Sequence, residues 1–255
     1  MRFASLGSGS QGNALVVEAQ GTRLLLDCGF GLAATVARLG RLGLAPEDLS
    51  AIVVTHEHDD HIGGVARLAR RYGIPVWVTP GTIAGFEILF AGVNEVRMIH
   101  NYEVFEVGGL MVQPFPVPHD ARVPAQYVNG NGASRLGVLT DAGCSTRHIE
   151  AMLSGCDALV LECNHDAEML RTSSYPQKLR DRIGGRFGHL DNAAAAGLLS
   201  SLDNGRLKHL VAAHLSQENN RPDLARAALS AAMNCAPEWI AIADQDGGLG
   251  WRQLG

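Results

Sequence analysis

The chain lacks the features that mark membrane, secreted and disordered proteins. It has no run of about 18 apolar residues, the length that a membrane-spanning helix needs, and no apolar signal segment near its start. Charged residues make up 18% of the 255 residues and hydrophobic residues 46%, so the chain can bury a sizeable core. Low-complexity linkers and internal repeats are absent as well. We therefore expect a folded, cytoplasmic protein that forms a single domain over residues 1–255.

The chain also has few cysteines, and fewer basic than acidic residues. The five cysteines are odd in number and irregularly spaced, which favours reduced thiols over a disulfide framework. The formal net charge is −5, whereas a protein that coats nucleic acid without selectivity would be basic. Any contact with nucleic acid must therefore be made by a local group of basic residues and not by the protein surface as a whole.

Short apolar strands alternate with amphipathic helices along the whole chain. Ala51–Thr55 is apolar at every position before the threonine, which is typical of a strand buried on both faces. Strands and a hairpin in both halves, with helices between them, predict an α/β (α+β) fold in which two sheets face each other with helices outside. The other expected elements are strands Asn13–Glu18, Thr22–Cys28, Pro75–Thr79, Leu136–Thr140, Ala158–Glu162, Leu210–Ala213 and Trp239–Ala243, a hairpin over Glu103–Val117, and helices Leu32–Leu42, Ile62–Tyr72, Asp191–Leu202 and Pro222–Met233.

The most informative segment is THEHDDHIGG, which directly follows the strand Ala51–Thr55. Within six residues it contains His56, His58, Asp60 and His61. A strand end followed by a tight loop can direct the first two histidines at one metal ion. The aspartate and the third histidine begin the next helix and can reach a second ion. Because imidazole and carboxylate together suit zinc, manganese or iron, the segment predicts a site for two divalent metal ions.

This segment resembles the metal-binding motif of the metallo-β-lactamase-fold hydrolase superfamily, and the resemblance covers nearly the whole chain. It implies a four-layer αββα sandwich that carries one or two metal ions, with further ligands later in the chain. His119, in the proline-rich turn PFPVPHD, fits the next histidine ligand. Asp141, at the strand end in GVLTDAG, fits the aspartate that bridges both metals in the family. A carboxylate buried there would be costly without a metal.

The last ligand implied by the resemblance is a histidine near the C-terminus, for which the chain offers four candidates. His209 and His214 lie at opposite ends of one strand, roughly 16 Å apart, so both cannot reach the site. His214 is preferred because the other ligands follow strand ends. His165 and His189 stay open as alternatives, since spacing alone excludes neither.

Features outside the metal motif favour a nuclease among the hydrolases of this superfamily. The opening SLGSGSQGNALVVE and the segments around His165 and His189 resemble a small bacterial exonuclease/phosphodiesterase branch, in which His189 would lie near the scissile phosphate. The opening can also offer backbone N–H groups to an anion. Between Arg171 and Arg186 five basic residues accompany one acid, so this stretch is expected to bind a phosphate backbone. The expected substrate-binding residues are His165, Arg180, Arg182 and Arg186.

The sequence thus predicts a metal-dependent phosphodiester hydrolase, a nuclease or exonuclease acting on DNA or RNA. Two ions would hold a water and lower its pKa, and the resulting hydroxide would attack phosphorus. Asp60 would orient this hydroxide or accept a proton, and His189 would protonate the leaving oxygen or bind a phosphate oxygen. The alternatives are a small-molecule cyclic phosphodiesterase and a thioesterase of the same fold. The expected partner is a nucleic acid or another phosphodiester, and no membrane.

Overall fold

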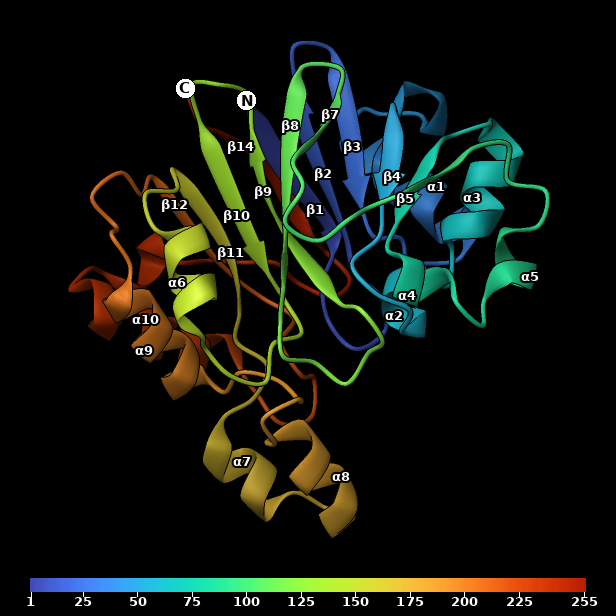
Figure 1. Cartoon of the computed structure of the whole chain (residues 1–255). Helices are drawn as coiled ribbons and strands as arrows, with labels where there is room; N and C mark the ends of the chain where they lie inside the picture. The colour runs from blue at the N-terminus through green and yellow to red at the C-terminus, as the bar shows by residue number, and fades with distance from the viewer.

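Two seven-stranded sheets face each other in the computed structural model, which describes residues 1–255 (Figure 1). The first sheet has the order β14-β1-β2-β3-β4-β5-β6 and the second the order β13-β12-β11-β10-β9-β8-β7. The strands of the first sheet are β14 (Leu249–Gln253), β1 (Arg2–Gly7), β2 (Ala14–Ala19), β3 (Thr22–Leu26), β4 (Ala51–Val53), β5 (Val76–Val78) and β6 (Val96–Met98). Those of the second are β13 (Ala241–Ile242), β12 (His209–Ala213), β11 (Ala158–Glu162), β10 (Arg135–Leu139), β9 (Ala125–Gly130), β8 (Leu110–Pro116) and β7 (Phe105–Val107).

Both faces of each sheet are buried, which explains why the central strands are almost entirely apolar. Side chains alternate between the two faces of a strand. Val53 and Val160 pack in the core between the two sheets, whereas their neighbours Ile52 and Leu161 pack in the cores beneath the outer helices. The predicted four-layer αββα sandwich is therefore confirmed.

The helices form the two outer layers. Apolar residues of α1 and α3 belong to the core beneath the first sheet, and those of α6, α9 and α10 to the core beneath the second. None of the helices combines the length and the apolar character that crossing a membrane requires. The α-helices are α1 (Leu32–Arg41), α2 (Asp59–Ile62), α3 (Val65–Tyr72), α4 (Pro80–Ile83), α5 (Glu87–Phe90), α6 (Arg147–Leu153), α7 (Ala167–Thr172), α8 (Gln177–Ile183), α9 (Asn192–Ser201) and α10 (Pro222–Met233), with 3₁₀ turns at Pro46–Asp48 and Pro237–Trp239.

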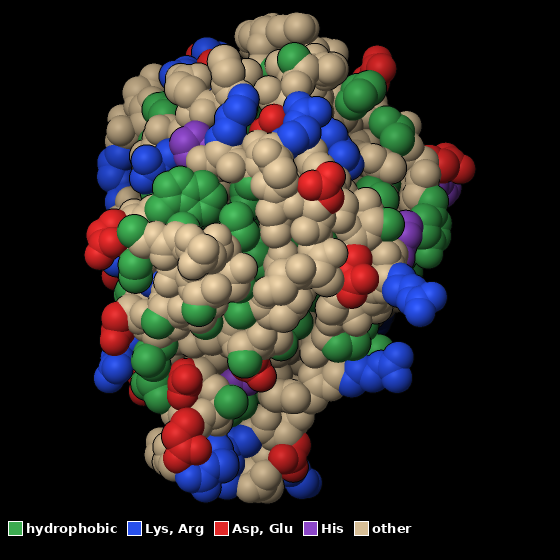
Figure 2. Space-filling view, turned by 90° about the vertical axis from the view of Figure 1, so that its left-hand side faces the viewer, with side chains coloured by type: hydrophobic (Ala, Val, Ile, Leu, Met, Phe, Trp, Pro, Cys, Tyr) green, Lys and Arg blue, Asp and Glu red, His purple; other side chains and the backbone are tan.

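One edge of the sandwich collects the carboxyl ends of strands from both sheets. Strands β3 and β4 are parallel, as are β10, β11 and β12, so the segments that follow them emerge at the same edge. Helices α7 and α8 project beyond this edge, at the bottom of Figure 1. Figure 2 shows the molecule from the left-hand side of Figure 1, and the projecting part at its bottom carries both basic and acidic side chains.

Three expectations about the elements need correction. The helix expected over Ile62–Tyr72 is two helices, because the chain turns at Gly63 and Gly64. A Cβ on Gly64 would overlap the carbonyl oxygen of Phe30, so this close approach requires glycine. The strand expected over Trp239–Ala243 is limited to β13, after a 3₁₀ turn. Strands β1, β6, β9 and β14 were not expected at all; of these, β14 forms by pairing with β1 from the opposite end of the chain.

Candidate metal centre

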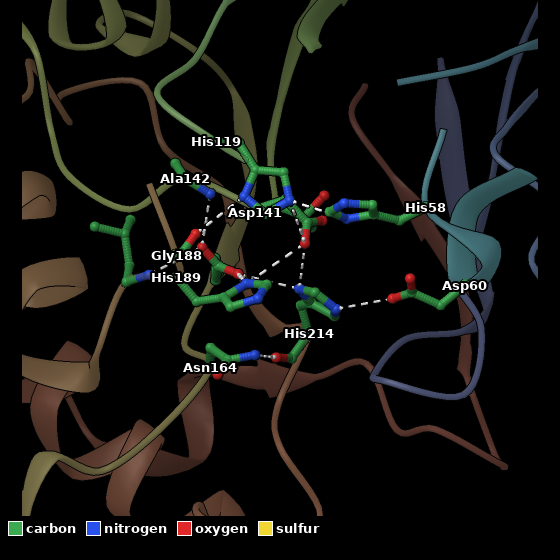
Figure 3. A network of polar contacts seen from close by, with 12 residues as sticks. His58, Asp60, His119, Asp141, Ala142, Asn164, Gly188, His189 and His214 are labelled. Atoms are coloured by element: carbon green, nitrogen blue, oxygen red, sulfur yellow. Dashed lines mark hydrogen bonds and ion pairs between the residues drawn. The ribbon is translucent and has the colours of Figure 1, made fainter. Parts of the chain in front are cut away.

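The structure brings all seven predicted ligands together at the edge where the strands end. Figure 3 shows His58, Asp60, His119, Asp141 and His214 among them. They come from the β4–α2 loop and α2, from the turn after β8, and from the first residues after β10 and β12. Nitrogen and oxygen atoms suited to metal binding lie within 4.8 Å of one another in four overlapping groups. These groups are His56, His58 and His119; His56, His61 and Asp141; Asp60, His61 and His214; and Asp141, Glu162, His189 and His214.

Three imidazoles form the first half of the cluster. The Nδ1 atom of His58 lies 3.0 Å from Nε2 of His56 and 3.2 Å from Nε2 of His119. The outer nitrogens of the latter two are already engaged, since Nδ1 of His56 lies 2.9 Å from the Thr55 hydroxyl and Nδ1 of His119 donates to the Gly188 carbonyl at 3.0 Å. The Nε2 atoms of His56 and His119 therefore present their lone pairs toward Nδ1 of His58.

Two carboxylates and two imidazoles form the second half. The Oδ2 atom of Asp60 lies 3.4 Å from Nε2 of both His61 and His214. The Asp141 carboxylate lies between the halves: Oδ2 is 3.0 Å from Nε2 of His61, and Oδ1 is 3.8 Å from Nε2 of His119. Asp141 is thus in the position of a bridging residue between two groups of ligands.

This donor set fits divalent cations. Facing lone pairs repel one another unless a proton or a metal ion lies between them, and one proton on Nδ1 of His58 can serve only one of the two Nε2 atoms of His56 and His119. Asp141 Oδ2 is buried without a hydrogen-bond partner, and such a group is costly unless it is paired. His61 donates its Nδ1 proton to Asp27 at 2.8 Å, so its Nε2 can offer Asp141 a proton only as the charged imidazolium, and a bound metal ion takes the place of that second proton. The nitrogen and oxygen donors suit zinc, manganese or iron.

The electrostatics of the cluster are dominated by burial and by opposite charges in contact. Burial by itself would lower the pKa of His214, but the carboxylates of Asp141, Asp60 and Glu162 outweigh it and raise that pKa to about 10. Burial, together with the neighbouring imidazole of His61, holds the pKa of His56 well below its ordinary value. The metal-free cluster therefore binds protons next to its carboxylates and disfavours them on His56 and His119, whose pKa values burial lowers.

The backbone is strained where two of the ligands leave their strands. Asp141 and His214 both have a φ of 55°, and Asp27, which directly follows β3, has a φ of 60°. Side chains other than glycine rarely adopt this left-handed region, and such residues concentrate at functional sites. Half of the six non-glycine residues with positive φ lie in or against this cluster, which favours a functional reason for the strain.

The sequence reasoning missed the carboxylates that hold the ligands from behind. Glu162, at the end of β11, is fully buried; its Oε1 lies 2.8 Å from Nδ1 of His189 and 3.0 Å from Nδ1 of His214. Asp27 accepts hydrogen bonds from His61 and from the Thr55 hydroxyl. Both acids end apolar strands, as Asp141 does, and this shared position was the signal that could have identified them.

The expected substrate-binding residues are distributed more widely. His165 is buried and lines a separate cavity of about 290 Å³ together with Arg180. Arg182 forms an ion pair with Asp120, beside the ligands, whereas Arg186 is exposed and has no ion-pair partner. His189, which was predicted as a catalytic residue, lies in the cluster itself, with its Nδ1 3.4 Å from Oδ1 of Asp141.

The glycine- and serine-rich opening does not form the expected anion cradle. Four of its N–H groups are already donated within the protein: Ser8 to the Asp244 carbonyl, Gly9 to the Asn13 side chain, Gln11 to the Gln245 side chain and Gly12 to the Gly9 carbonyl. The turn serves instead to place Asn13, whose amide lies 3.2 Å from the Asp60 carboxylate.

Comparisons with known proteins agree with this geometry. The family model described as "Beta-lactamase superfamily domain" matches residues 22–214. The chain is 37% identical to exodeoxyribonuclease YycJ of Bacillus anthracis over 90% of its own length and 88% of that protein's. Among solved structures, the metallo-β-lactamase-fold protein YhfI of Bacillus subtilis is similar with a TM-score of 0.77 at 16% identity, over 98% of each chain. Zn²⁺-bound PqqB of Methylobacterium extorquens is similar with a TM-score of 0.75 at 20% identity, over 99% of this chain and 100% of that one.

Proposed function

The chain belongs to the β-lactamase superfamily, and from this membership we propose that it is a metal-dependent nuclease that degrades DNA from its ends. The sequence prediction of the superfamily and of a metal-dependent hydrolase is confirmed. The observation that carries the proposal is the cluster of histidine and aspartate ligands, present without a gap in a chain similar to an exodeoxyribonuclease. We take residues 1–255 as one catalytic domain.

The ligand assignment is part of the proposal. His56, His58 and His119 would hold one divalent ion, Asp60, His61 and His214 a second, and Asp141 would bridge them. Nitrogen and oxygen donors without thiolate favour zinc or manganese, with iron as a third candidate. When bound, such ions supply Lewis acidity that polarises a phosphoryl oxygen and acidifies water.

The chain's own groups have separate tasks in this proposal. Glu162 engages Nδ1 of His189, so Nε2 of this partly exposed histidine is the nitrogen that can donate to a phosphate oxygen or protonate the leaving oxygen. Asp60 directs Oδ2 at His61 and His214, while its Oδ1 has no hydrogen bond or ion pair with another side chain and can accept a proton. Arg186, without an acidic partner, can bind the phosphate backbone.

Turnover of defined substrates tests the proposal. Metal-loaded protein is incubated with labelled single- and double-stranded DNA, with RNA, with a circular single strand, with a cyclic mononucleotide, with a glutathione thioester and with bis-p-nitrophenyl phosphate. We expect cleavage of linear DNA and resistance of the circle. Asp141→Asn is expected to keep the fold and to lose nearly all turnover. Turnover of the cyclic nucleotide or the thioester in place of DNA would contradict the proposal; neither alternative is favoured by the similarity to an exodeoxyribonuclease.

Two histidine variants separate metal binding from substrate contact. His214→Ala is expected to lower metal content, because His214 contacts Asp60. His189→Ala is expected to keep the metal and to lose rate about 10²–10⁴-fold if His189 is a general acid, with a smaller loss on a p-nitrophenolate leaving group. Elemental analysis and rates on both substrates check this. Loss of metal from His189→Ala would exchange the two roles, and an equal loss of rate on both substrates would make His189 a phosphate-binding residue.

A further inference from the structure

An exposed aromatic residue lies close to the cluster along the chain, two residues before His189. Phe187 is 57% exposed and belongs to none of the three hydrophobic cores, although burial of its side chain would stabilise the protein. It lies between Arg186, which is exposed and unpaired, and Gly188, whose carbonyl accepts a hydrogen bond from the candidate ligand His119. Figure 3 shows Gly188 and His189 within the network of the candidate centre.

The backbone that carries this ring is held rigidly. The Phe187 carbonyl accepts a hydrogen bond from the Asp120 N–H at 3.0 Å, and the Gly188 N–H donates to the Gly185 carbonyl at 2.8 Å. The turn also packs tightly against the residues after β10, since a Cβ on Gly143 would overlap the backbone of Arg186 and Gly188. The backbone of Phe187 is therefore fixed next to residues of the candidate centre, and its side chain is exposed to solvent.

The surroundings of the ring match single-stranded nucleic acid. Proteins that bind single strands combine cations along the phosphate backbone with aromatic rings that stack on bases. Arg186, the residue that precedes Phe187, supplies an exposed cation without an ion-pair partner. Phe187 is two residues before His189, and consecutive Cα atoms are about 3.8 Å apart. The side chain of Phe187 is therefore within reach of the nucleotides on either side of a phosphodiester bond that is bound at the cluster.

We infer that the Phe187 ring stacks on a nucleobase of the strand being cleaved, close to the scissile phosphodiester. The inference rests on the proposed nuclease function and adds to it the contact that distinguishes a nucleic acid from a small phosphodiester. Phe187 thereby becomes a substrate-binding residue that selects no particular base, because every base has a face on which a ring can stack.

Abasic substrates test this stacking directly. The rate constant kcat/KM is measured on a labelled single-stranded oligodeoxynucleotide and on a series in which one nucleotide after another lacks its base. Phe187→Ala is expected to lower kcat/KM on the intact strand about 5- to 100-fold, mainly through KM, and Phe187→Trp to restore it. One abasic position should cost the wild type a similar factor, and at that position Phe187→Ala should lose nothing more. Trp239→Ala, which removes an exposed ring from the turn after α10, is the control and should leave the rates unchanged.

The outcomes separate this inference from the proposed function. If the wild type cleaves the strand but Phe187→Ala cleaves it equally well, the stacking inference is wrong and the nuclease stands. If Phe187→Ala loses the same factor on every abasic strand, the ring acts on the protein and not on a base, which also overturns the inference. If the wild type hydrolyses bis-p-nitrophenyl phosphate but no oligonucleotide, the proposed function fails and the inference with it.

Discussion

Glu162 connects two histidines of the centre with the protein backbone behind them. Its Oε1 faces the Nδ1 atoms of His189 and His214, while its Oε2 accepts hydrogen bonds from the N–H groups of Ala142 and Leu190 at 3.0 and 3.1 Å. Burial by itself would raise the pKa of Glu162, but the imidazoles of His189 and His214 outweigh burial and lower that pKa to about 2. A carboxylate that orients ligand histidines in this way raises their basicity and fixes their rings.

The first prediction is that Glu162→Gln weakens metal binding. The glutamine has one oxygen and one NH₂ group in place of two oxygens. Its NH₂ group is a hydrogen-bond donor, and it must point either at the two histidines or at the two backbone N–H groups, which are donors themselves. We expect metal affinity to fall about 10- to 100-fold, as for other residues that orient ligands. Metal titration monitored by elemental analysis measures it, and Glu106→Gln on exposed β7 serves as the control. Equal affinity in the two variants would show that Glu162 does not orient the ligands.

A second residue-scale prediction concerns Gly29, which lies against the metal loop. A Cβ at this position would overlap the carbonyl group of Asp60, whose oxygen accepts a hydrogen bond from the Asn13 N–H at 2.7 Å. We expect Gly29→Ala to destabilise the protein by about 1–3 kcal/mol and to lower metal content, because the loop must move. Gly197→Ala is the matched control: Gly197 is exposed in the middle of α9 with no atom near a new Cβ, and the change should stabilise by about 0.5–1 kcal/mol. Urea unfolding of both variants checks the opposite signs.

Among the elements, the strands of the sandwich and the projecting helices α7 and α8 contribute differently to the centre. Strand ends hold their residues within a few ångströms, because neighbouring strands lie about 4.8 Å apart. The projecting helices bury little, since Leu170 is the only buried residue of α7 and α8 has none. Part of their positive charge is neutralised, because Arg171 pairs with Glu168 and Arg182 with Asp120. The basic stretch predicted from the sequence is therefore weaker as a phosphate-binding surface than its composition indicates.

At this scale we predict the salt dependence of DNA binding. Changing Arg180, Arg182 and Arg186 together to alanine should reduce the slope of log affinity against log salt by about 0.7 for each phosphate that these side chains bind on a single strand. Because Arg182 is already paired, we expect a decrease that corresponds to about one to two phosphates and not three. Fluorescence anisotropy of a labelled oligonucleotide at several salt concentrations measures the slope, with Arg67→Ala and Arg71→Ala on α3 as the control pair. An unchanged slope would place the three arginines outside the DNA path.

For the whole molecule, the charges of the centre predict how metal-free stability depends on pH. The pKa of His214 is raised from its ordinary value of 6.5 to about 10, and that of His61 is also raised. A raised pKa contributes stability that is complete below pH 6.5 and is lost as the pH rises through 10. The metal-free protein should therefore lose stability between about pH 7 and about pH 10.

Bound metal should reverse this trend, because metal binding needs deprotonated imidazoles and its stabilisation grows with affinity. Urea midpoints of chelator-treated and metal-loaded protein at several pH values measure both curves. In His214→Gln the decline of the metal-free protein should become shallower, whereas His148→Gln, an exposed residue on α6, should leave it unchanged. A metal-free protein whose stability rises over this range would contradict the assigned charges.

The amino-acid sequence by itself determined the features that depend on neighbours along the chain. The spacing from His56 to His61 places four ligands on one loop and the start of α2, and apolar runs such as Ala158–Glu162 mark strands buried on both faces. The family resemblance, together with the strand-end position, located Asp141, and the strand-end position favoured His214 over His209. In the structure His209 begins β12 and bonds to the Gln253 carbonyl, whereas His214 directly follows the other end of that strand.

Only the tertiary structure decided the contacts between residues far apart in the chain. It places Glu162 behind His189 and His214, pairs Arg182 with Asp120, and adds β14 beside β1 across nearly the whole length of the sequence. None of these contacts follows from local propensity, because each forms only when distant strands fold into their sheets and bring their ends to a common edge. A carboxylate at a strand end has the same sequence pattern whether it faces a metal, a histidine or solvent. Which of these it contacts depends on the residues that the fold brings next to it.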